Sequence, residues 1–153
     1  MKSERFSKTL LVVFGSALAL YILAFGLMQN CRTSKGPWRV VFSTDNTGTP
    51  SLFITQSALK ISKQIHFPDQ KISHLNLSQE ILFNDPNKTN APFGEIIFQD
   101  LTFLPGTVMF NFFGHGIELL PRVLNVDQQE HDWKNGEVIS VTGAGNFKPH
   151  PHK

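Results

Sequence analysis

The sequence is poor in residues that cross-link small domains and in motifs that carry common catalytic chemistry. Its 153 residues include one cysteine, Cys31, so no intrachain disulfide can form. The chain has no HExxH motif, no Cys/His array and no GxSxG motif. No feature of the sequence therefore points to a disulfide framework, a zinc protease or a hydrolase nucleophile. We expect a protein that is not an enzyme and that uses no cofactor.

An excess of charge of one sign is also missing from most of the chain. Lys2, Arg5 and Lys8 lie near the N-terminus, where Glu4 is the only acid. Of the 14 basic and 12 acidic residues in the chain, 11 of each follow Met28. A neutral domain lacks the basic surface that nucleic acid requires, so we expect no nucleic-acid partner.

The longest apolar run is residues 9–28, TLLVVFGSALALYILAFGLM, which contains no charge. As a helix rising ~1.5 Å per residue, these residues are long enough to cross a hydrocarbon core of ~30 Å. The run is longer than the apolar region of a cleaved signal peptide, and its last small-x-small triplet, at Ala24, is still followed by Leu27 and Met28. We therefore predict a retained signal anchor that makes the chain a single-pass membrane protein.

The residues around the anchor bear on its orientation and its partners. Basic residues flank both ends, but the short N-terminal tail and the long C-terminal region favour an N-terminus in the cytoplasm. The C-terminal domain would then be extracytoplasmic, and periplasmic in a Gram-negative source. Gly15 and Ala19 form a small-xxx-small pair that could admit a second helix, although such pairs also occur by chance. Cys31 lacks the small preceding residues of a lipoprotein signal, so an inert boundary thiol is favoured over an intermolecular disulfide.

After the anchor the pattern changes to short alternating segments separated by Gly, Pro and Asn. Residues 38–43, WRVVFS, place Trp38, Val40 and Phe42 on one face, which is the period of a strand. The other segments with strand character are 51–56, 59–67, 71–77, 80–83, 95–98, 107–112, 117–120, 122–126 and 137–142. We predict an all-β sandwich or jelly roll of about eight to ten short antiparallel strands.

These patterns divide the chain into five parts. They are a basic tail (1–8), the anchor (9–28), a linker (29–37), a β domain (38–146) and a polar tail (147–153) that has no reason to fold. Trp38 fits either a core position or the membrane interface, and Trp133 either a binding surface or the end of the sandwich. We favour the structural role for both tryptophans.

A metal or catalytic site would have to be assembled from residues that are far apart in the sequence. His115, Glu118 and His131 are weak candidates for metal ligands, because histidine and carboxylate are ligand types but their spacing matches no known motif. The alternative is that the Gly114–Gly116 bend holds His115 and that His131 faces solvent. An enzyme would need a cleft that unites these groups with Asp132.

Two functional hypotheses remain. The first is an accessory or scaffolding subunit of a larger membrane complex, because 11 of the 14 phenylalanines follow Met28 and exposed apolar patches mark interaction sites. Its partners would be the membrane and other membrane-protein subunits. The candidate apolar binding surface comprises Phe98, Phe103, Phe110 and Phe112.

The second hypothesis is lipid handling. Residues 109–119, MFNFFGHGIEL, resemble the strand-Gly-His-strand step in the jelly-roll domains of single-pass lipopolysaccharide-export proteins. The resemblance covers eleven residues and the general architecture of one helix followed by a β domain. It implies a jelly roll that passes lipid along an open interior groove, lined here by Phe98, Phe103, Phe110 and Phe112. A closed, filled sandwich would oppose it.

Overall fold

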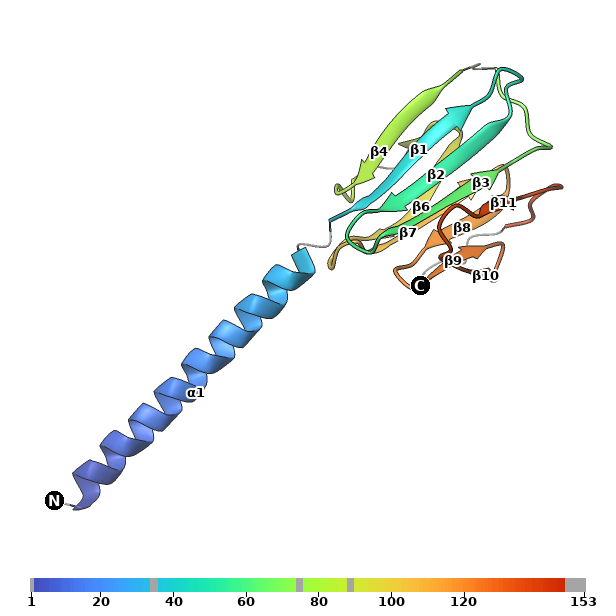
Figure 1. The fold of residues 1–153 in the computed structure, drawn as a ribbon. Helices are drawn as coiled ribbons and strands as arrows, with labels where there is room; N and C mark the ends of the chain where they lie inside the picture. The colour runs from blue at the N-terminus through green and yellow to red at the C-terminus, as the bar shows by residue number, and fades with distance from the viewer. Residues whose placement is uncertain (1, 34–35, 74–75, 88–89, 148–153) are drawn as a thin grey trace. The chain divides into compact units, whose positions relative to one another are not determined.

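A computed structural model describes residues 2–33, 36–73, 76–87 and 90–147 of the chain (Figure 1). The chain forms two compact units, Met1–Ser34 and Lys35–Lys153. The first unit contains one helix, α1 (Lys2–Thr33), and the second is built of strands. We describe each unit by itself.

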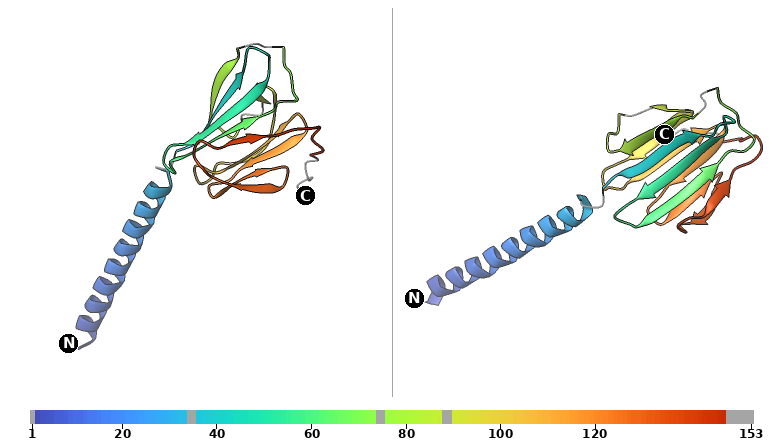
Figure 2. Two further views of the ribbon diagram at one scale, coloured as in Figure 1. Left: turned by 45° about the vertical axis from the view of Figure 1, so that its right-hand side comes forward. Right: turned by 45° about the horizontal axis from the view of Figure 1, so that its top comes forward.

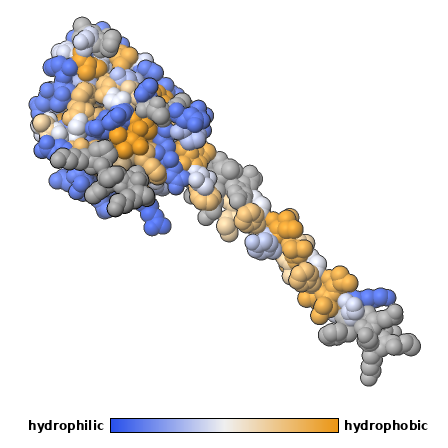
Figure 3. Space-filling view, turned by 180° about the vertical axis from the view of Figure 1, so that it is seen from behind, coloured by the Kyte–Doolittle hydropathy of each residue, from blue (hydrophilic) through white to orange (hydrophobic). Residues whose placement is uncertain are grey.

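Helix α1 contains the predicted apolar run and extends beyond it in both directions. Within this helix, the 22 residues Ser7–Met28 form a stretch that is long and apolar enough to cross a membrane. Residues 29–33, predicted as linker, continue the helix, because no Gly or Pro interrupts the chain before Gly36. Apolar side chains are exposed along the helix, Val12 for example at 71% (Figure 3). Cys31 lies in the helix, but the expectation for its side chain falls outside the described residues.

The second unit is a β-sandwich of eleven described strands in two sheets, which confirms the predicted fold class (Figure 1, Figure 2). The first sheet has the order β11-β3-β2-β1-β4 and the second β10-β9-β8-β7-β6-β5. The strands are β1 (Trp38–Thr44), β2 (Pro50–Gln56), β3 (Ile61–His66), β4 (Ser78–Phe83), β5 (Asn90–Ala91), β6 (Gly94–Asp100), β7 (Thr107–Phe112), β8 (His115–Leu119), β9 (Val123–Val126), β10 (Gln129–Asp132) and β11 (Val138–Ser140). All pairs are antiparallel except β11 with β3, which is parallel.

Alternate residues of the long strands fill the space between the sheets. Strand β1 buries Trp38, Val40 and Phe42 completely, and β7 does the same with Phe110 and Phe112. The rings of Phe110 and Phe112 stack with centroids 5.0 Å apart. Both residues were predicted to line a binding surface, and this prediction is wrong because they are core residues with no exposed area.

Some strand boundaries differ from those predicted, for local reasons. The strand expected at 59–67 begins at Ile61, because Lys60 has a positive φ of 55° in the preceding turn. The run at 71–77 forms no strand in its described part, and strand β4 starts at Ser78. Strand β10 was missed, because its sequence QEHD has no apolar residue. It follows a two-residue turn in which Asp127 and Gln128 both have positive φ, 50° and 68°, as in a type I′ hairpin.

Two tryptophans from different sheets of the sandwich, or from the segment that follows a sheet, contact each other. Trp38 of β1 stacks on Trp133, which follows β10, with ring centroids 5.2 Å apart. The Nε1 atoms of Trp38 and Trp133 donate hydrogen bonds to the carbonyl oxygens of Gly106 and Leu120, respectively. These contacts give both tryptophans the structural role that was favoured.

The described C-terminal segment is folded back onto the second sheet as far as Phe147, which was predicted as the first residue of a free tail. The rest of that predicted tail, 148–153, lies outside the described residues. The backbone N–H of Phe147 donates to Gly114, with 2.8 Å between the nitrogen and the carbonyl oxygen. A Cβ atom placed on Gly116 would overlap the Phe147 ring, so the missing side chain of Gly116 makes room for that ring. Because Gly116 and Glu118 alternate with buried residues of β8, the ring lies on the outer face of the second sheet.

Candidate functional site

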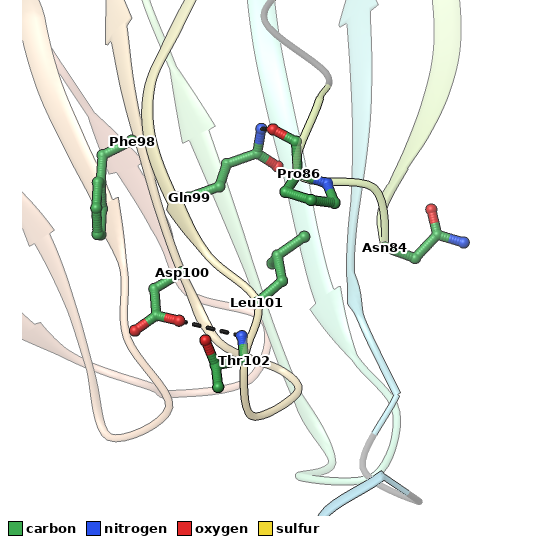
Figure 4. A pocket seen from close by; sticks show the side chains of 7 residues that line it. All are labelled: Asn84, Pro86, Phe98, Gln99, Asp100, Leu101 and Thr102. Carbon is green, nitrogen blue, oxygen red and sulfur yellow. Dashed lines mark hydrogen bonds between the residues drawn. The ribbon is translucent and has the colours of Figure 1, made fainter.

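One hollow of the described β domain is an open groove of about 600 Å³ beside the end of strand β6 (Figure 4). Asn84 and Pro86 line it from the segment after β4, and Phe98 and the residues up to Thr102 line it from β6 and the following turn. Gln99 Nε2 donates to the Pro86 carbonyl oxygen at 3.4 Å, which connects the two walls. Phe98 is 39% and the nearby Phe103 is 52% exposed, so these two predicted surface residues do face solvent.

The one acid in this groove is fixed by the turn that follows it. The backbone N–H of Thr102 donates to Asp100 Oδ1 at 3.0 Å (Figure 4). Hydrogen bonds from the side chain and then the backbone of Thr102 lower the pKa of Asp100. The carboxylate therefore shapes the turn, and the groove contains no second acid or base with which it could share a proton.

A second group of hollows lies around the C-terminal segment on the second sheet. One, of about 340 Å³, includes His115, Asp127 and Thr142 in its lining, and another, of about 200 Å³, includes Glu118 and Glu130. Gln128 and Phe147 line both hollows. The folded C-terminal segment thus forms part of this surface, and residue 147 belongs to the domain.

His115 is held at the first of these hollows by contacts on both sides of its ring. Its Nδ1 lies 2.6 Å from Asp127 Oδ2, and its Nε2 lies 3.4 Å from the Gly143 carbonyl oxygen. The other carboxylate oxygen of Asp127 accepts the Gly116 backbone N–H at 2.9 Å. His115 is 3% exposed, and both ring nitrogens already face oxygen atoms. Its role is to join β8, the β9–β10 turn and the C-terminal segment.

The three candidate metal ligands are not brought together. Glu118 Oε2 accepts a hydrogen bond from Asn125 Nδ2 at 3.0 Å, and His131 lies on β10 opposite Leu124. Among the residues that the structure describes, no three His, Cys, Asp or Glu side chains are grouped closely enough to hold a metal ion. Both the metal and the enzyme hypotheses need His115, Glu118 and His131 to lie close together, and the structure does not place them so.

Carboxylates and amides alternate across the outer face of the second sheet, which we call the acidic face. Met109, Glu118, Asn125 and Glu130 are opposite one another in a row across β7, β8, β9 and β10. A second pair, on β7 and β6, joins Asn111 Nδ2 to Glu95 Oε1 at 3.3 Å. The acidic face is defined by Glu95, Met109, Asn111, Glu118, Asn125 and Glu130.

The acidic face has many hydrogen-bond acceptors and few donors. Each of its two asparagines uses its NH₂ group on a neighbouring glutamate, and the Oδ1 atoms of Asn111 and Asn125 are buried without a hydrogen-bond partner. None of the strands of the second sheet contains Lys or Arg. The glutamates of this face therefore have no Lys or Arg partner on the described strands of their own sheet.

Sequence reasoning did not identify the acidic face, although a signal for it is present. The apolar strand sequences MFNF and VLNV each carry one asparagine, Asn111 and Asn125, at a position that alternates with buried residues. The alternation predicts an outward side chain, but only the register between strands places each asparagine beside a glutamate. Phe147 was missed because it follows a glycine-rich segment that has no periodic pattern.

Comparisons of this chain with protein-family models, curated proteins and solved structures found no match.

Proposed function

We propose that this chain is a single-pass membrane protein whose extracytoplasmic β domain is an accessory or scaffolding subunit of a larger membrane complex, without enzymatic activity or a cofactor. The apolar helix Ser7–Met28 supports the anchor. The observation that carries the assembly role is the filled core of the sandwich, with the hollows described above on its outside. Binding to such a domain takes place on its outer surfaces, as it does in protein–protein recognition.

The phenylalanine content supports this proposal less than expected. Five of the eleven phenylalanines after Met28 are completely buried: Phe42, Phe67, Phe83, Phe110 and Phe112. Phe53, Phe98 and Phe103 are exposed by 39–52%, so part of each ring faces solvent. Phe53 lies on β2 in the first sheet, whereas Phe98 lines the groove beside β6 and Phe103 follows the last residue of its lining in the sequence. A partner therefore has exposed aromatic rings on both sheets or their loops to contact.

The lipid-handling alternative requires an apolar path through the interior. Phe110 and Phe112, which were expected to line such a path, are packed against Phe83, Phe42 and each other, with centroids 5.0–5.8 Å apart. This packing leaves the alternative without a structural observation in its favour.

Native mass spectrometry of the full-length protein, extracted from its own membrane in mild detergent, tests the proposal. We expect other membrane proteins to co-purify at fixed stoichiometry. A monomer that carries a phospholipid or glycolipid mass would favour lipid handling instead, and a bare monomer would contradict an assembly role that survives extraction.

The orientation of the anchor has its own test, because Cys31 is the sole cysteine. In the Cys31→Ser background, a cysteine at the exposed Ser78 should react with a membrane-impermeant maleimide before the cytoplasmic membrane is broken. A cysteine at Ser3 in the same background should react only afterwards. The opposite order would place the β domain in the cytoplasm.

A further inference from the structure

We propose that one end of the β-sandwich, the end at which the chain enters it, docks on the lipid headgroups of the membrane that holds the anchor. We call it the entry end and define it by the described segments 36–37, 57–60, 84–87, 101–106, 120–122 and 133–137. The inference rests on the proposed function, which supplies the membrane anchor, and adds a second contact with the bilayer. It concerns the surface of the bilayer and not the passage of lipid through the interior of the sandwich.

The directions of the strands bring these segments to one end. In the first sheet β1, β3 and β11 begin there and β2 and β4 end there, because β1 is antiparallel to both of its neighbours and β11 is parallel to β3 (Figure 1). Trp38, the first residue of β1, donates a hydrogen bond to Gly106 in the β6–β7 turn and stacks on Trp133. Trp133 donates to Leu120, which begins the β8–β9 turn. The turns of the second sheet at this end are thereby identified.

The covalent connection to the anchor keeps the entry end within reach of the membrane. Residues 29–35 alone separate Met28, the last residue of the apolar stretch, from Gly36. Even fully extended, at ~3.5 Å per residue, this connection spans at most roughly 28 Å. Gly36 is fixed to the sandwich, because the buried Gln56 donates from Nε2 to the carbonyl oxygens of Gly36 and Pro37 at 2.9 and 3.2 Å. This limit on distance holds for every orientation of the two units.

The β2–β3 turn is held beside the point of entry. Gln56 Oε1 accepts a hydrogen bond from the backbone N–H of Ala58 at 2.8 Å. The N–H of Lys60 donates to the Ser57 carbonyl oxygen at 3.2 Å, and the Lys60 carbonyl oxygen accepts from Asn135 Nδ2 at 2.9 Å. The exposed Lys60 therefore belongs to an ordered turn, which can meet a surface without rearranging its backbone.

Exposed apolar side chains gather near the entry end. In the described β domain the large apolar side chains that are exposed by 39–52% are Phe53, Phe98, Phe103 and Val138. Phe103 lies in the β6–β7 turn, Val138 directly follows segment 133–137, and Phe98 is near the end of β6. Phe53 is the exception, in the middle of β2. Exposed apolar groups that lie beside basic residues are typical of surfaces that bind the membrane interface.

The described turns at the two ends of the sandwich differ in charge. At the entry end their exposed basic residues are Lys60, Arg122 and Lys134. The acids of these turns are Asp85 and Glu137, and Glu137 pairs with the buried Lys63. At the opposite end the exposed charged residues of the turns are Asp45, Asp69, Lys71 and Asp127.

This difference favours anionic lipid as the surface on which the entry end docks. Asp100 and Asp132 end the strands that lead into its turns, and Arg32 and Lys35 precede it in the sequence. Lysine and arginine near a surface of anionic lipid are attracted to it. The opposite end has three acids in its described turns against one base, so the same surface repels it. Phe103 is then a lipid contact, and a protein partner has Phe53.

The test measures how well lipid shields a fluorophore at the entry end. The full-length protein with Cys31→Ser and Ser57→Cys is labelled at the new cysteine, in the exposed β2–β3 turn. It is placed in nanodiscs of phosphatidylcholine, either alone or with one quarter phosphatidylglycerol. We expect quenching by neutral acrylamide to be at least twofold weaker in the anionic nanodiscs, and added salt to remove this difference. A label at Asn46→Cys, in the exposed β1–β2 loop of the opposite end, should be quenched equally in both.

Charge variants locate the contact. Lys60→Gln should at least halve the difference in quenching between the two lipid compositions, and Lys60→Gln/Lys134→Gln should abolish it. The matched control, Lys71→Gln, removes the same charge from the opposite end and should leave the difference unchanged. The fluorescence of Trp38 and Trp133, the two tryptophans of the chain, verifies that each variant is folded.

Equal quenching of the label at residue 57 in both lipid compositions, or equal effects of Lys60→Gln and Lys71→Gln, would overturn the inference. The proposed function would stand after that result if native mass spectrometry finds partner subunits. If lipid shields the label but no partner subunits are found, the lipid contact stands and the assembly role fails. A chain that does not enter nanodiscs at all would remove the anchor, on which both proposals depend.

Discussion

The Nζ atom of Lys63, whose side chain is 1% exposed, lies 2.6 Å from Glu137 Oε2 and 2.6 Å from the carbonyl oxygen of Asp132. These contacts connect strand β3 of the first sheet to the segment that leads from β10 of the second sheet to β11. The Glu137 side chain is 48% exposed, so water reaches one member of the pair and not the other. The two substitutions that break the pair therefore have unequal costs.

Glu137→Ala should destabilise the β domain more than Lys63→Met. The first substitution leaves a buried ammonium with one carbonyl oxygen, whereas the second removes the buried charge and leaves a glutamate that water can solvate. The measurement is urea unfolding followed by the fluorescence of Trp38 and Trp133, and Glu137→Gln, which keeps a hydrogen-bond acceptor, should lie between wild type and Glu137→Ala. Equal midpoints for Glu137→Ala and Lys63→Met would contradict this reading.

The stability that the Lys63–Glu137 pair contributes should depend on pH. The hydrogen bond from Lys63 is the largest effect on the pKa of Glu137 and lowers it from its usual 4.5. Burial opposes this shift, and the charges of Lys63, Lys134 and His131 add smaller lowering effects. A carboxyl group whose pKa is lower in the folded state than in the unfolded state stabilises the folded state when the pH is above the unfolded-state pKa. This stabilisation is lost as the pH falls through the folded-state pKa. The difference in unfolding midpoint between wild type and Glu137→Gln should therefore shrink below pH 4.5.

A second carboxylate organises the loop between β1 and β2. Asp45 Oδ1 accepts hydrogen bonds from the N–H and hydroxyl groups of Thr47 and from the N–H of Thr49, and these contacts lower the pKa of Asp45 to about 2, with Lys71 contributing less. The ionised carboxylate of Asp45 therefore stabilises the folded state fully above pH 3.8, and this stabilisation is lost as the pH falls toward 2.

Asp45→Asn should accordingly lower the thermal midpoint at pH 7, and the difference from wild type should disappear near pH 2. Thermal unfolding at a series of pH values is the measurement. A difference that stays constant from pH 7 to pH 2 would show that the charge of Asp45 does not contribute.

The buried and exposed phenylalanines provide a matched pair for the core. Phe110→Ala should cost about 3–5 kcal/mol of unfolding free energy, because Phe110 has no exposed area and stacks on Phe112. Phe53→Ala, at a side chain 42% exposed on β2, should cost less than about 1 kcal/mol. Urea unfolding measures both, and a cost below about 1 kcal/mol for Phe110→Ala would remove Phe110 from the core.

The packing of Phe147 on Gly116 predicts a non-additive pair of substitutions. Gly116→Ala places a methyl group where the ring lies and should cost about 1–3 kcal/mol through overpacking. In the Phe147→Ala background the same substitution should cost clearly less, because the ring is gone. A double-mutant cycle of unfolding free energies measures the coupling, and additive effects would show that Phe147 does not rest on Gly116.

The sequence was sufficient to predict the helix and the class of the domain, because both depend on local patterns. The uncharged run at 9–28 and the alternation in residues 38–43 are visible without any knowledge of the fold. Strand β10 and the parallel pairing of β11 with β3 were not predictable in the same way. The first has no apolar residue, and the second is decided by the packing of segments about 70 residues apart.

The candidate site was less predictable than the fold. Phe98, Phe103, Phe110 and Phe112 look equivalent as a list of aromatic residues, and only their positions in the sandwich divide them into two exposed and two buried side chains. The acidic face likewise depends on register, since Glu118 and Glu130 become neighbours of Asn125 only when β8, β9 and β10 pair.

Photo-crosslinking in the intact native membrane tests the central claim most directly, because it avoids extraction. A photoreactive residue is placed in turn at Phe53 on the first sheet, at Phe103 by the groove and at Gln128 beside the acidic face. The account predicts a discrete adduct with another membrane protein from at least one of these three positions. Adducts with lipid alone, or no adduct from any of the three positions, would contradict a role as an assembly subunit.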